Sequence, residues 1–288
     1  MAFPPEGYIV GAQKAGTTSL AALLNAQSGI TLSQPKEARY FTEFWHKGLD
    51  WYRERFVGPE GSVFIDASPG YAAAPTKAFS AEIHPNDPRK EVPERIFRLS
   101  PDARFIYILR DPVARTYSAY WHDVRSGRLK CSFMEAIRKN PFYLRTSDYA
   151  GQIHNYLEYF DLDRFLLLDF ADFKREPEHV VAECCRFLDV PYQMSSIDQQ
   201  SRQKNRGYQL SGIAKLARAI SGSDENFKKL ANSVRAAAPK SVVSLLTSVV
   251  VREIPPMSHD ERIYVKDLLA ERIDELKELT GFDVSAWN

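Results

Sequence analysis

Two hydrophobic patterns alternate along the chain. Short apolar runs, enriched in β-branched and aromatic residues except in the last, predict strands at residues 8–10, 63–65, 104–109 and 164–169. Between them, apolar residues recur every three or four positions, which predicts helices at 17–25, 49–56, 113–126, 132–139, 149–160 and 178–188. Such alternation is typical of an α/β fold, a parallel sheet flanked by crossover helices.

The C-terminal part has a different pattern. Strand patterns stop after Pro191, and the remainder is predicted as a polar loop followed by helices, the last at 259–280 with Gly281 as its C-cap. The apolar run 241–251 is too short to span a bilayer, which takes about 20 helical residues, and is expected to be a packed helix. Nothing resembles a linker, so we expect one domain over residues 1–288, helical from about residue 210.

One segment inside the sheet region has neither pattern. Residues 72–93 are rich in Pro, Ala and charge, which predicts an irregular excursion from the sheet. Loops of this length often form lids or acceptor-binding surfaces.

Composition narrows the classes of partner. The chain has 38 Lys and Arg against 37 Asp and Glu, a formal net charge of +1, so no overall field attracts nucleic acid or anionic lipid. The cysteines include the adjacent pair Cys184 and Cys185, which suits neither a disulfide nor metal-ligand spacing. The N-terminus lacks a signal-peptide pattern, so we expect a cytoplasmic protein without a metal site or a transmembrane segment.

A candidate phosphate-binding loop follows the first predicted strand. The sequence from Tyr8 reads Y-I-V-G-A-Q-K-A-G-T-T-S-L, a strand, a tight loop and a helix start. Backbone N–H groups and the dipole at a helix start favour anions. In the nucleotide-triphosphate loop a lysine follows the second glycine, whereas here Lys14 precedes Gly16 and Thr17 takes the lysine position. The loop by itself would also fit a simple turn with an N-cap.

A second cation stands at the end of the predicted strand 104–109. Arg110 is followed by Asp-Pro and by a predicted helix that carries Ser118 about two turns further on. Open α/β sheets bind ligands at the carboxyl ends of their strands. Two anion sites on neighbouring strands suit a ligand with two separated phosphates.

Together these motifs, K-A-G-T-T-S from Lys14 and L-R-D-P from Leu109 with Ser118, resemble the sulfotransferase family that uses 3′-phosphoadenosine 5′-phosphosulfate (PAPS). The similarity is greatest to the carbohydrate, heparan-sulfate-like branch and its bacterial relatives. It runs from Tyr8 to about Tyr208, with a family-like ending at 279–287. The resemblance implies a sulfotransferase, phosphate-loop-like fold with PAPS as the donor, 3′,5′-ADP as the product and no metal.

The resemblance also implies which residues hold the nucleotide. The 5′ end would be held by Lys14, Ala15, Gly16, Thr17, Thr18 and Ser19, and the 3′-phosphate by Arg110 and Ser118. Related enzymes close a basic, glycine-containing loop over the 3′-phosphate and adenine, and the run S-R-Q-K-N-R-G-Y from Ser201 resembles it. The implied contacts there are Lys204, Arg206 and Gly207; a solvated charge run is the alternative.

Sulfuryl transfer needs a cation for the leaving oxygen and a base for the acceptor proton. Lys14 suits the first role. The segment Q-P-K-E-A-R-Y-F resembles the P-K-E-x-x-[FY]-F element of the carbohydrate branch, whose glutamate is the general base, which implies Glu37 for the second. The alternative is that Glu37 only pairs with Lys36 or Arg39 at the surface.

Histidines are the nearest rivals for the role of base. The branch that sulfates phenols and steroids uses a histidine, and His46 and His122 are the nearest candidates here. The segment 66–71, D-A-S-P-G-Y, resembles a family element beside the acceptor, but heparan-type enzymes often have lysine where Ala67 stands. This departure argues against a polyanionic acceptor.

The expected acceptor is therefore a hydroxyl or amine of a carbohydrate, glycolipid or natural product, either small or presented at a membrane surface, and not a nucleic acid. Two other functions stay open. A phosphate-loop kinase would need a lysine after Gly16 and a magnesium-binding aspartate. A non-catalytic nucleotide-binding relative would have kept the phosphate sites and lost the chemistry.

Overall fold

One parallel sheet of five strands forms the centre of the fold. The computed structural model describes residues 3–193, 208–210 and 251–287. The strands lie in the order β2-β3-β1-β4-β5, which confirms the predicted α/β class and the four predicted strands. Their bounds are β1 (Gly7–Gly11), β2 (Ile30–Leu32), β3 (Val63–Asp66), β4 (Arg104–Leu109) and β5 (Phe165–Asp169).

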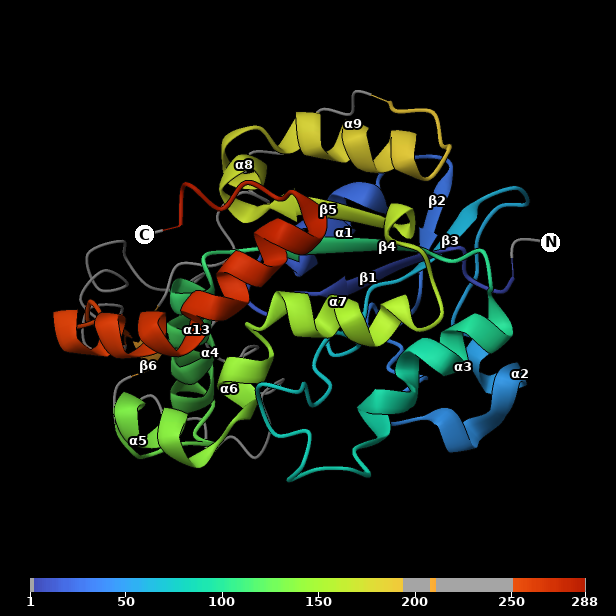
Figure 1. Ribbon diagram of the computed structural model, residues 1–288. Coiled ribbons are helices and arrows are strands. Elements are labelled where there is room, and N and C mark those ends of the chain that lie inside the picture. The colour runs from blue at the N-terminus through green and yellow to red at the C-terminus, as the bar shows by residue number, and fades with distance from the viewer. Residues whose placement is uncertain (1–2, 194–207, 211–250, 288) are drawn as a thin grey trace, which may run out of the picture. The chain divides into compact units, whose positions relative to one another are not determined.

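Helices cover both faces of this sheet (Figure 1). On one face α9 packs against α1 and α8, and on the other α7 packs against α3 and α13. Their bounds are α1 (Thr17–Leu24), α3 (Val92–Leu99), α7 (Tyr149–Leu157), α8 (Phe170–Arg175), α9 (Pro177–Phe187) and α13 (His259–Thr280). The other helical segments are η1 (Trp45–Lys47), α2 (Gly48–Arg53), η2 (Pro88–Glu91), α4 (Pro112–Arg125), α5 (Phe133–Lys139), α6 (Phe142–Arg145) and η3 (Leu162–Arg164).

The core lies between the sheet and these helices. The central strand β1 is buried along its whole length, as is typical of parallel strands covered on both faces. On β4, the ring of Phe105 lies 5.0 Å from Tyr156, 4.7 Å from Phe160 and 4.8 Å from Phe165, measured between centroids. This aromatic cluster packs α7 and β5 against β4.

Several short elements were not predicted. Helix α3 begins at Val92 with a proline in its first turn, where proline is tolerated, so the predicted excursion ends where this helix starts. Helices α6 and α8 have only four and six residues, too few to show a helical period. The long helix was predicted with its end: Gly281 has φ 68° and donates its N–H to Lys277 O at 2.8 Å.

The expectation that no strand follows Pro191 was wrong. Strands β6 (Tyr208–Leu210) and β7 (Val251–Glu253) pair antiparallel. Two strands of three residues each, far apart in the sequence, leave no alternating pattern that local analysis would detect. The prediction of a packed helix at 241–251 falls mostly outside the described residues, and its last residue, Val251, is in β7.

The chain forms two compact units. Residues 1–120, 131–202 and 259–288 make up the first, which holds the five-stranded sheet, and residues 121–130 and 203–258 the second. The predicted nucleotide contacts Lys204, Arg206 and Gly207 lie outside the described residues. A single domain over 1–288 stays a prediction.

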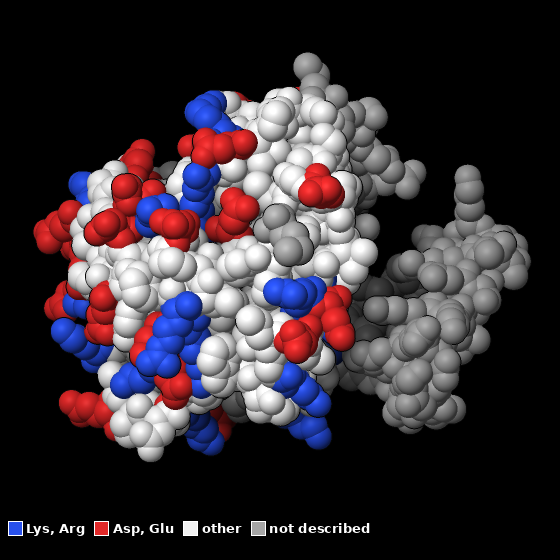
Figure 2. Space-filling model, turned by 90° about the vertical axis from the view of Figure 1, so that its right-hand side faces the viewer, with Lys and Arg blue, Asp and Glu red and all other residues white. Residues whose placement is uncertain are grey.

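Charge on the surface is mixed. Figure 2 looks at the side where the strands begin, and there Lys and Arg lie among Asp and Glu. This distribution agrees with the formal net charge of +1. In the described parts of the chain, none of the helices is both long and apolar enough to cross a membrane.

Candidate active site

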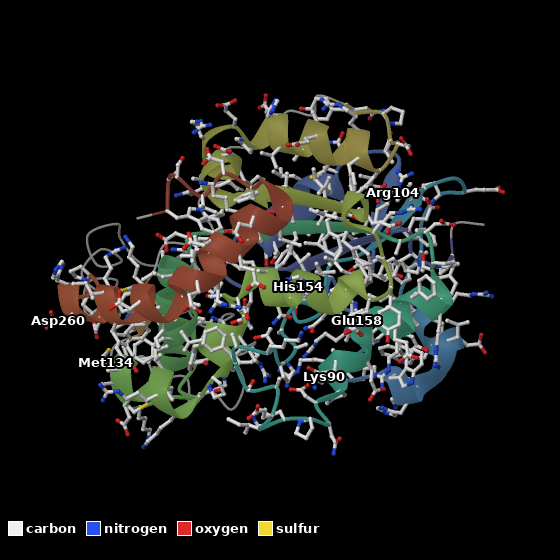
Figure 3. All side chains as sticks on the ribbon, in the orientation of Figure 1. Lys90, Arg104, Met134, His154, Glu158 and Asp260 are labelled. Atoms are coloured by element: carbon white, nitrogen blue, oxygen red, sulfur yellow. The ribbon has the colours of Figure 1, made fainter. Side chains whose placement is uncertain are left out.

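The carboxyl ends of all five strands meet at one edge of the sheet. This edge is on the left in Figure 1; the first residue of β4, Arg104, is labelled at the opposite edge in Figure 3. We call this carboxyl edge the ligand edge, because open α/β sheets bind ligands at the carboxyl ends of their strands. Three loops start there, residues 12–16 after β1, 33–41 after β2 and 67–72 after β3, and Arg110 follows β4 directly. The parallel topology thus brings the sequence-predicted motifs to a common edge.

The loop after β1 makes a tight turn into α1. Ala12 donates its N–H to Ile108 O on β4 at 2.8 Å, and Ala15 donates to Ala12 O at 3.1 Å. Lys14 and Gly16 both have left-handed backbone conformations, with φ 73° and 91°. Gly16 is the N-cap of α1 and provides no side-chain cap. Ser19 N donates to Gly16 O at 3.0 Å, and the N–H groups of Thr17 and Thr18 ahead of it, at the start of the helix, suit an anion.

Arg110 joins the two predicted anion sites. Its Nη1 donates to the carbonyl oxygen of Lys14 at 3.0 Å, and its guanidinium carbon lies 5.3 Å from the ring centroid of Phe170. The Tyr149 hydroxyl donates to Arg110 O at 2.7 Å. Burial lowers the pKa of Arg110 from its ordinary value, yet guanidinium stays cationic at neutral pH. A cation therefore lies directly beside the phosphate loop.

The hydroxyl residues of the two motifs differ in exposure. Thr17 is buried, Thr18 is exposed, and Ser19 and Ser118 are half-buried. Ser118 is on α4, whose first turn is capped by Asp111: its Oδ1 accepts from Ala114 N at 2.7 Å. The nucleotide contacts assigned to these hydroxyls stay predictions.

Arg115 was assigned no role from the sequence. It is fully buried, and it donates to the Ser147 hydroxyl, to Tyr143 O and, at 3.5 Å, to Gln13 O in the phosphate loop. Burial lowers its pKa to about 10. The sequence offered one indication of its burial, since Arg115 lies on the same helical face as the buried apolar residues of α4. Through its hydrogen bonds, Arg115 links the loop after β1 to residues 143–147.

Glu37 lies in the loop after the edge strand β2. Its Oε1 is 3.1 Å from Lys36 Nζ, and 41% of its side chain is exposed. Arg39 instead pairs with Glu43 at 2.9 Å. The pairing with Lys36 that was considered as an alternative is thus present, but exposed ion pairs of this kind are weak, of the order of 0–1 kcal/mol. The role of Glu37 as base stays a prediction.

Asp66, at the end of β3, is a buried acid close to this loop. Tyr52 and Tyr71 donate their hydroxyls to Asp66 Oδ2, each at 2.8 Å, and Ser68 donates to Oδ1 at 2.6 Å. Burial raises the pKa of Asp66 above its ordinary value of 3.8, although the hydrogen bonds oppose this rise. The sequence analysis did not assign this residue a role.

The two histidines considered as rival bases are on helical elements. His46 is in the exposed helix η1, and His122 is half-buried in the last turns of α4. Within the described ranges no group of three or more His, Cys, Asp or Glu side chains could hold a metal ion.

A tight loop between a central strand and a helix, a cation after the neighbouring strand and a carboxylate after the edge strand are typical of α/β enzymes that bind nucleotides at the carboxyl edge of the sheet. Residues 4–229 match the family described as the sulfotransferase domain. The chain belongs to this family, whose members are enzymes that use PAPS. The predicted family, fold and enzyme class are therefore confirmed.

Two of the similar proteins are named as heparan sulfate enzymes. The mouse bifunctional heparan sulfate N-deacetylase/N-sulfotransferase 3 is 31% identical over 210 residues, which are 65% of this chain and 22% of that protein. The mouse heparan sulfate glucosamine 3-O-sulfotransferase 5 is 27% identical over 207 residues, 66% of this chain and 55% of that protein. Both relatives extend well beyond the matched part. A sulfotransferase structure from Alicyclobacillus acidocaldarius shares the fold, with TM-score 0.66, 24% identity and 98% of each chain covered.

Proposed function

We propose that this protein transfers a sulfuryl group from PAPS to a hydroxyl or amine of a carbohydrate, glycolipid or natural-product acceptor, with Glu37 as the general base. The observation that carries the proposal is the 3.0 Å hydrogen bond from Arg110 Nη1 to Lys14 O. It brings the two proposed anion sites next to each other, which supports a ligand with phosphates at both its 5′ and 3′ positions.

The residues at this edge fit such a nucleotide. The first-turn N–H groups of α1 and the Lys14 ammonium would hold the 5′ end, and Arg110 and Ser118 would hold the 3′-phosphate. Any side chain at position 16 would enter the space of Phe170, with a Cβ only 2.8 Å from its Cε2, so only glycine allows the loop to pack this closely against Phe170. When bound, PAPS supplies the sulfuryl group and a nucleotide leaving group.

The chain's own residues would divide the chemistry. Glu37 takes the proton of the acceptor hydroxyl or amine as the acceptor atom bonds to sulfur. Lys14 neutralises the charge that builds on the bridging oxygen as the sulfur–oxygen bond to the nucleotide breaks. The proton remains on the Glu37 carboxylate until it exchanges with water.

Two further features concern the setting of the reaction. All three cysteines are free thiols, which supports a reducing compartment such as the cytoplasm. The two relatives named above are heparan sulfate enzymes, which supports a carbohydrate acceptor. Ala67, however, is buried and uncharged at a position where a polyanion would favour a cation.

Nucleotide binding is tested by thermal unfolding. Addition of 3′,5′-ADP without Mg²⁺ should raise the melting temperature, because a ligand at 100 times its Kd stabilises by about 2.7 kcal/mol. Arg110→Ala should weaken binding by about 2 kcal/mol, the contribution of a hydrogen bond to a charged group. Arg104→Ala is the control, since Arg104 lies at the opposite end of β4 and binds Phe187 O. A response to ATP with Mg²⁺ alone would favour a kinase.

The base is tested by Glu37→Gln. This variant should bind 3′,5′-ADP normally and lose turnover of labelled PAPS with sugar, glycolipid and phenol acceptors, because an amide accepts no proton. Glu43→Gln, which changes an exposed carboxylate paired with Arg39, should keep turnover. Full activity in Glu37→Gln would remove Glu37 as base and favour His46 or His122. No transfer to any acceptor by the unmodified protein would favour a non-catalytic relative.

A further inference from the structure

The backbone that follows Glu37 is bonded to the buried Asp66 cluster. The Ala38 backbone bonds to the Asp66 carboxylate itself. Arg39 N donates to Ser68 Oγ at 3.0 Å, and Phe41 N donates to Tyr71 OH at 3.4 Å. Three backbone groups within four residues are therefore bonded to a single buried acid and to two of its three hydroxyl partners.

The direction of these bonds is set by the chemistry of the carboxylate. An ionised carboxylate accepts hydrogen bonds and donates none. The hydroxyls of Ser68 and Tyr71 must therefore point their protons at Asp66, which leaves their oxygen lone pairs for the N–H groups of Arg39 and Phe41. Asp66 thus orients two hydroxyls as acceptors for the Glu37 loop.

The loop has a conformation that needs such support. Arg39 has φ 50°, in the left-handed region that non-glycine residues seldom adopt, and such residues persist where the surroundings determine their conformation. The Tyr52 ring stacks on the neighbouring Tyr40, with centroids 4.2 Å apart and planes within 8°. The cluster therefore holds the loop in two ways: through hydrogen bonds to its backbone and through stacking on the Tyr40 ring.

We propose that Asp66, acting through Ser68 and Tyr71, is a positioning residue that holds Glu37 at the ligand edge of the sheet. The inference rests on the proposed role of Glu37 as the base. Asp66 itself is fully buried beneath the loop, so it acts on the reaction through Glu37.

The test compares three conservative variants. Ser68→Ala and Tyr71→Phe each remove a hydroxyl that joins Asp66 to the loop. Tyr52→Phe is the matched control. It also removes a hydroxyl that donates to Asp66, but it keeps the ring that stacks on Tyr40. Each variant is measured for kcat, for affinity for 3′,5′-ADP and for amide hydrogen exchange at residues 38–41.

We expect Ser68→Ala to lower kcat about 10- to 100-fold, the effect of displacing a catalytic group by about 1 Å. Exchange at Arg39 N–H should become faster and the Kd for 3′,5′-ADP should stay within about twofold, while Tyr52→Phe changes none of these strongly. In the Glu37→Gln background the same substitution should produce no further loss, because the group that it positions is already absent.

The two proposals fail in different ways. If Glu37→Gln keeps full turnover, the base assignment is wrong whatever the cluster does. Two other results would show that Asp66 does not act through Glu37. In the first, Glu37→Gln is inactive but Ser68→Ala and Tyr71→Phe keep full kcat. In the second, Ser68→Ala loses as much activity in the Glu37→Gln background as in the unmodified protein. Asp66→Asn, should it fold, is expected to behave like Ser68→Ala.

Discussion

At the scale of single residues, position 16 requires glycine for two reasons, its backbone conformation and its packing. Its φ of 91° is left-handed, and a Cβ would lie 2.8 Å and 3.0 Å from two ring carbons of Phe170. The same Phe170 ring packs against the Arg110 guanidinium. A side chain at position 16 would therefore displace the ring that lies against the Arg110 guanidinium.

Gly16→Ala is expected to weaken the binding of 3′,5′-ADP at least tenfold and to lower the melting temperature. Gly61→Ala is the control for backbone strain alone, because Gly61 has a similar φ of 81° with nothing within 4 Å of the added Cβ. Calorimetric titration of both variants measures the difference. Equal nucleotide affinity in the two would show that the contact with Phe170 has no part in binding.

At the scale of elements, the excursion at residues 72–93 is fastened to α6 and α7. The Gln152 side chain bonds to both backbone groups of Ala74, at 3.0 Å and 2.8 Å. Arg145 Nη2 lies 3.2 Å from Asp87 Oδ2, with only 5% and 8% of the two side chains exposed. The segment was expected to form a lid or an acceptor-binding surface. These bonds hold it against α6 and α7, which favours a fixed surface over a mobile lid.

Arg145→Met should lower the free energy of unfolding by about 3 kcal/mol or somewhat less, because breaking a buried pair costs 3–5 kcal/mol and Asp87 keeps Arg89 at 3.0 Å. It should also speed proteolysis within 72–93. Arg98→Met, which removes the exposed pair with Glu94, should cost less than about 0.5 kcal/mol. Urea unfolding compares them, and equal stability of the two variants would contradict the anchoring role.

At the scale of the whole molecule, the C-terminal tail reaches residues that contact Arg110 and α8. Trp287 Nε1 donates to Asp169 Oδ2 at 3.0 Å, and its ring lies 5.9 Å from Tyr149 in an edge-on arrangement. Asp169 also accepts from Ala171 N at the start of α8, and Tyr149 bonds to the Arg110 backbone. The end of the chain thus supports two of the elements that hold Arg110 in place.

Trp287→Ala is expected to weaken 3′,5′-ADP binding by about 1–2 kcal/mol, since it removes a hydrogen bond and an aromatic contact behind Arg110. Val284→Ala, a packing loss in the same tail, is the control. Calorimetry at matched temperature below both melting transitions separates binding from stability. Unchanged affinity in Trp287→Ala would confine the tail to a role in folding.

Much of this architecture could be predicted from the sequence. Four strands, the long helix with its glycine cap and both phosphate motifs depend on periodicity or spacing within some twenty residues, and such patterns are visible locally. Helices α6 and α8 were missed because they are too brief to show a period. The start of α3, which carries a proline, was assigned to the excursion, and β6 and β7 pair over a long separation in the sequence.

The sequence by itself determined the family and the α/β class and predicted the chemistry of each motif, because these depend on residue type and local order. Only the tertiary structure decided which motifs meet: Arg110 and Lys14 are 96 positions apart, and Arg115 and Gln13 are 102 apart. The strand order and the burial of Asp66 likewise arise from packing between distant segments. Parallel pairing brings such segments together, and a pattern read along the chain does not contain that information.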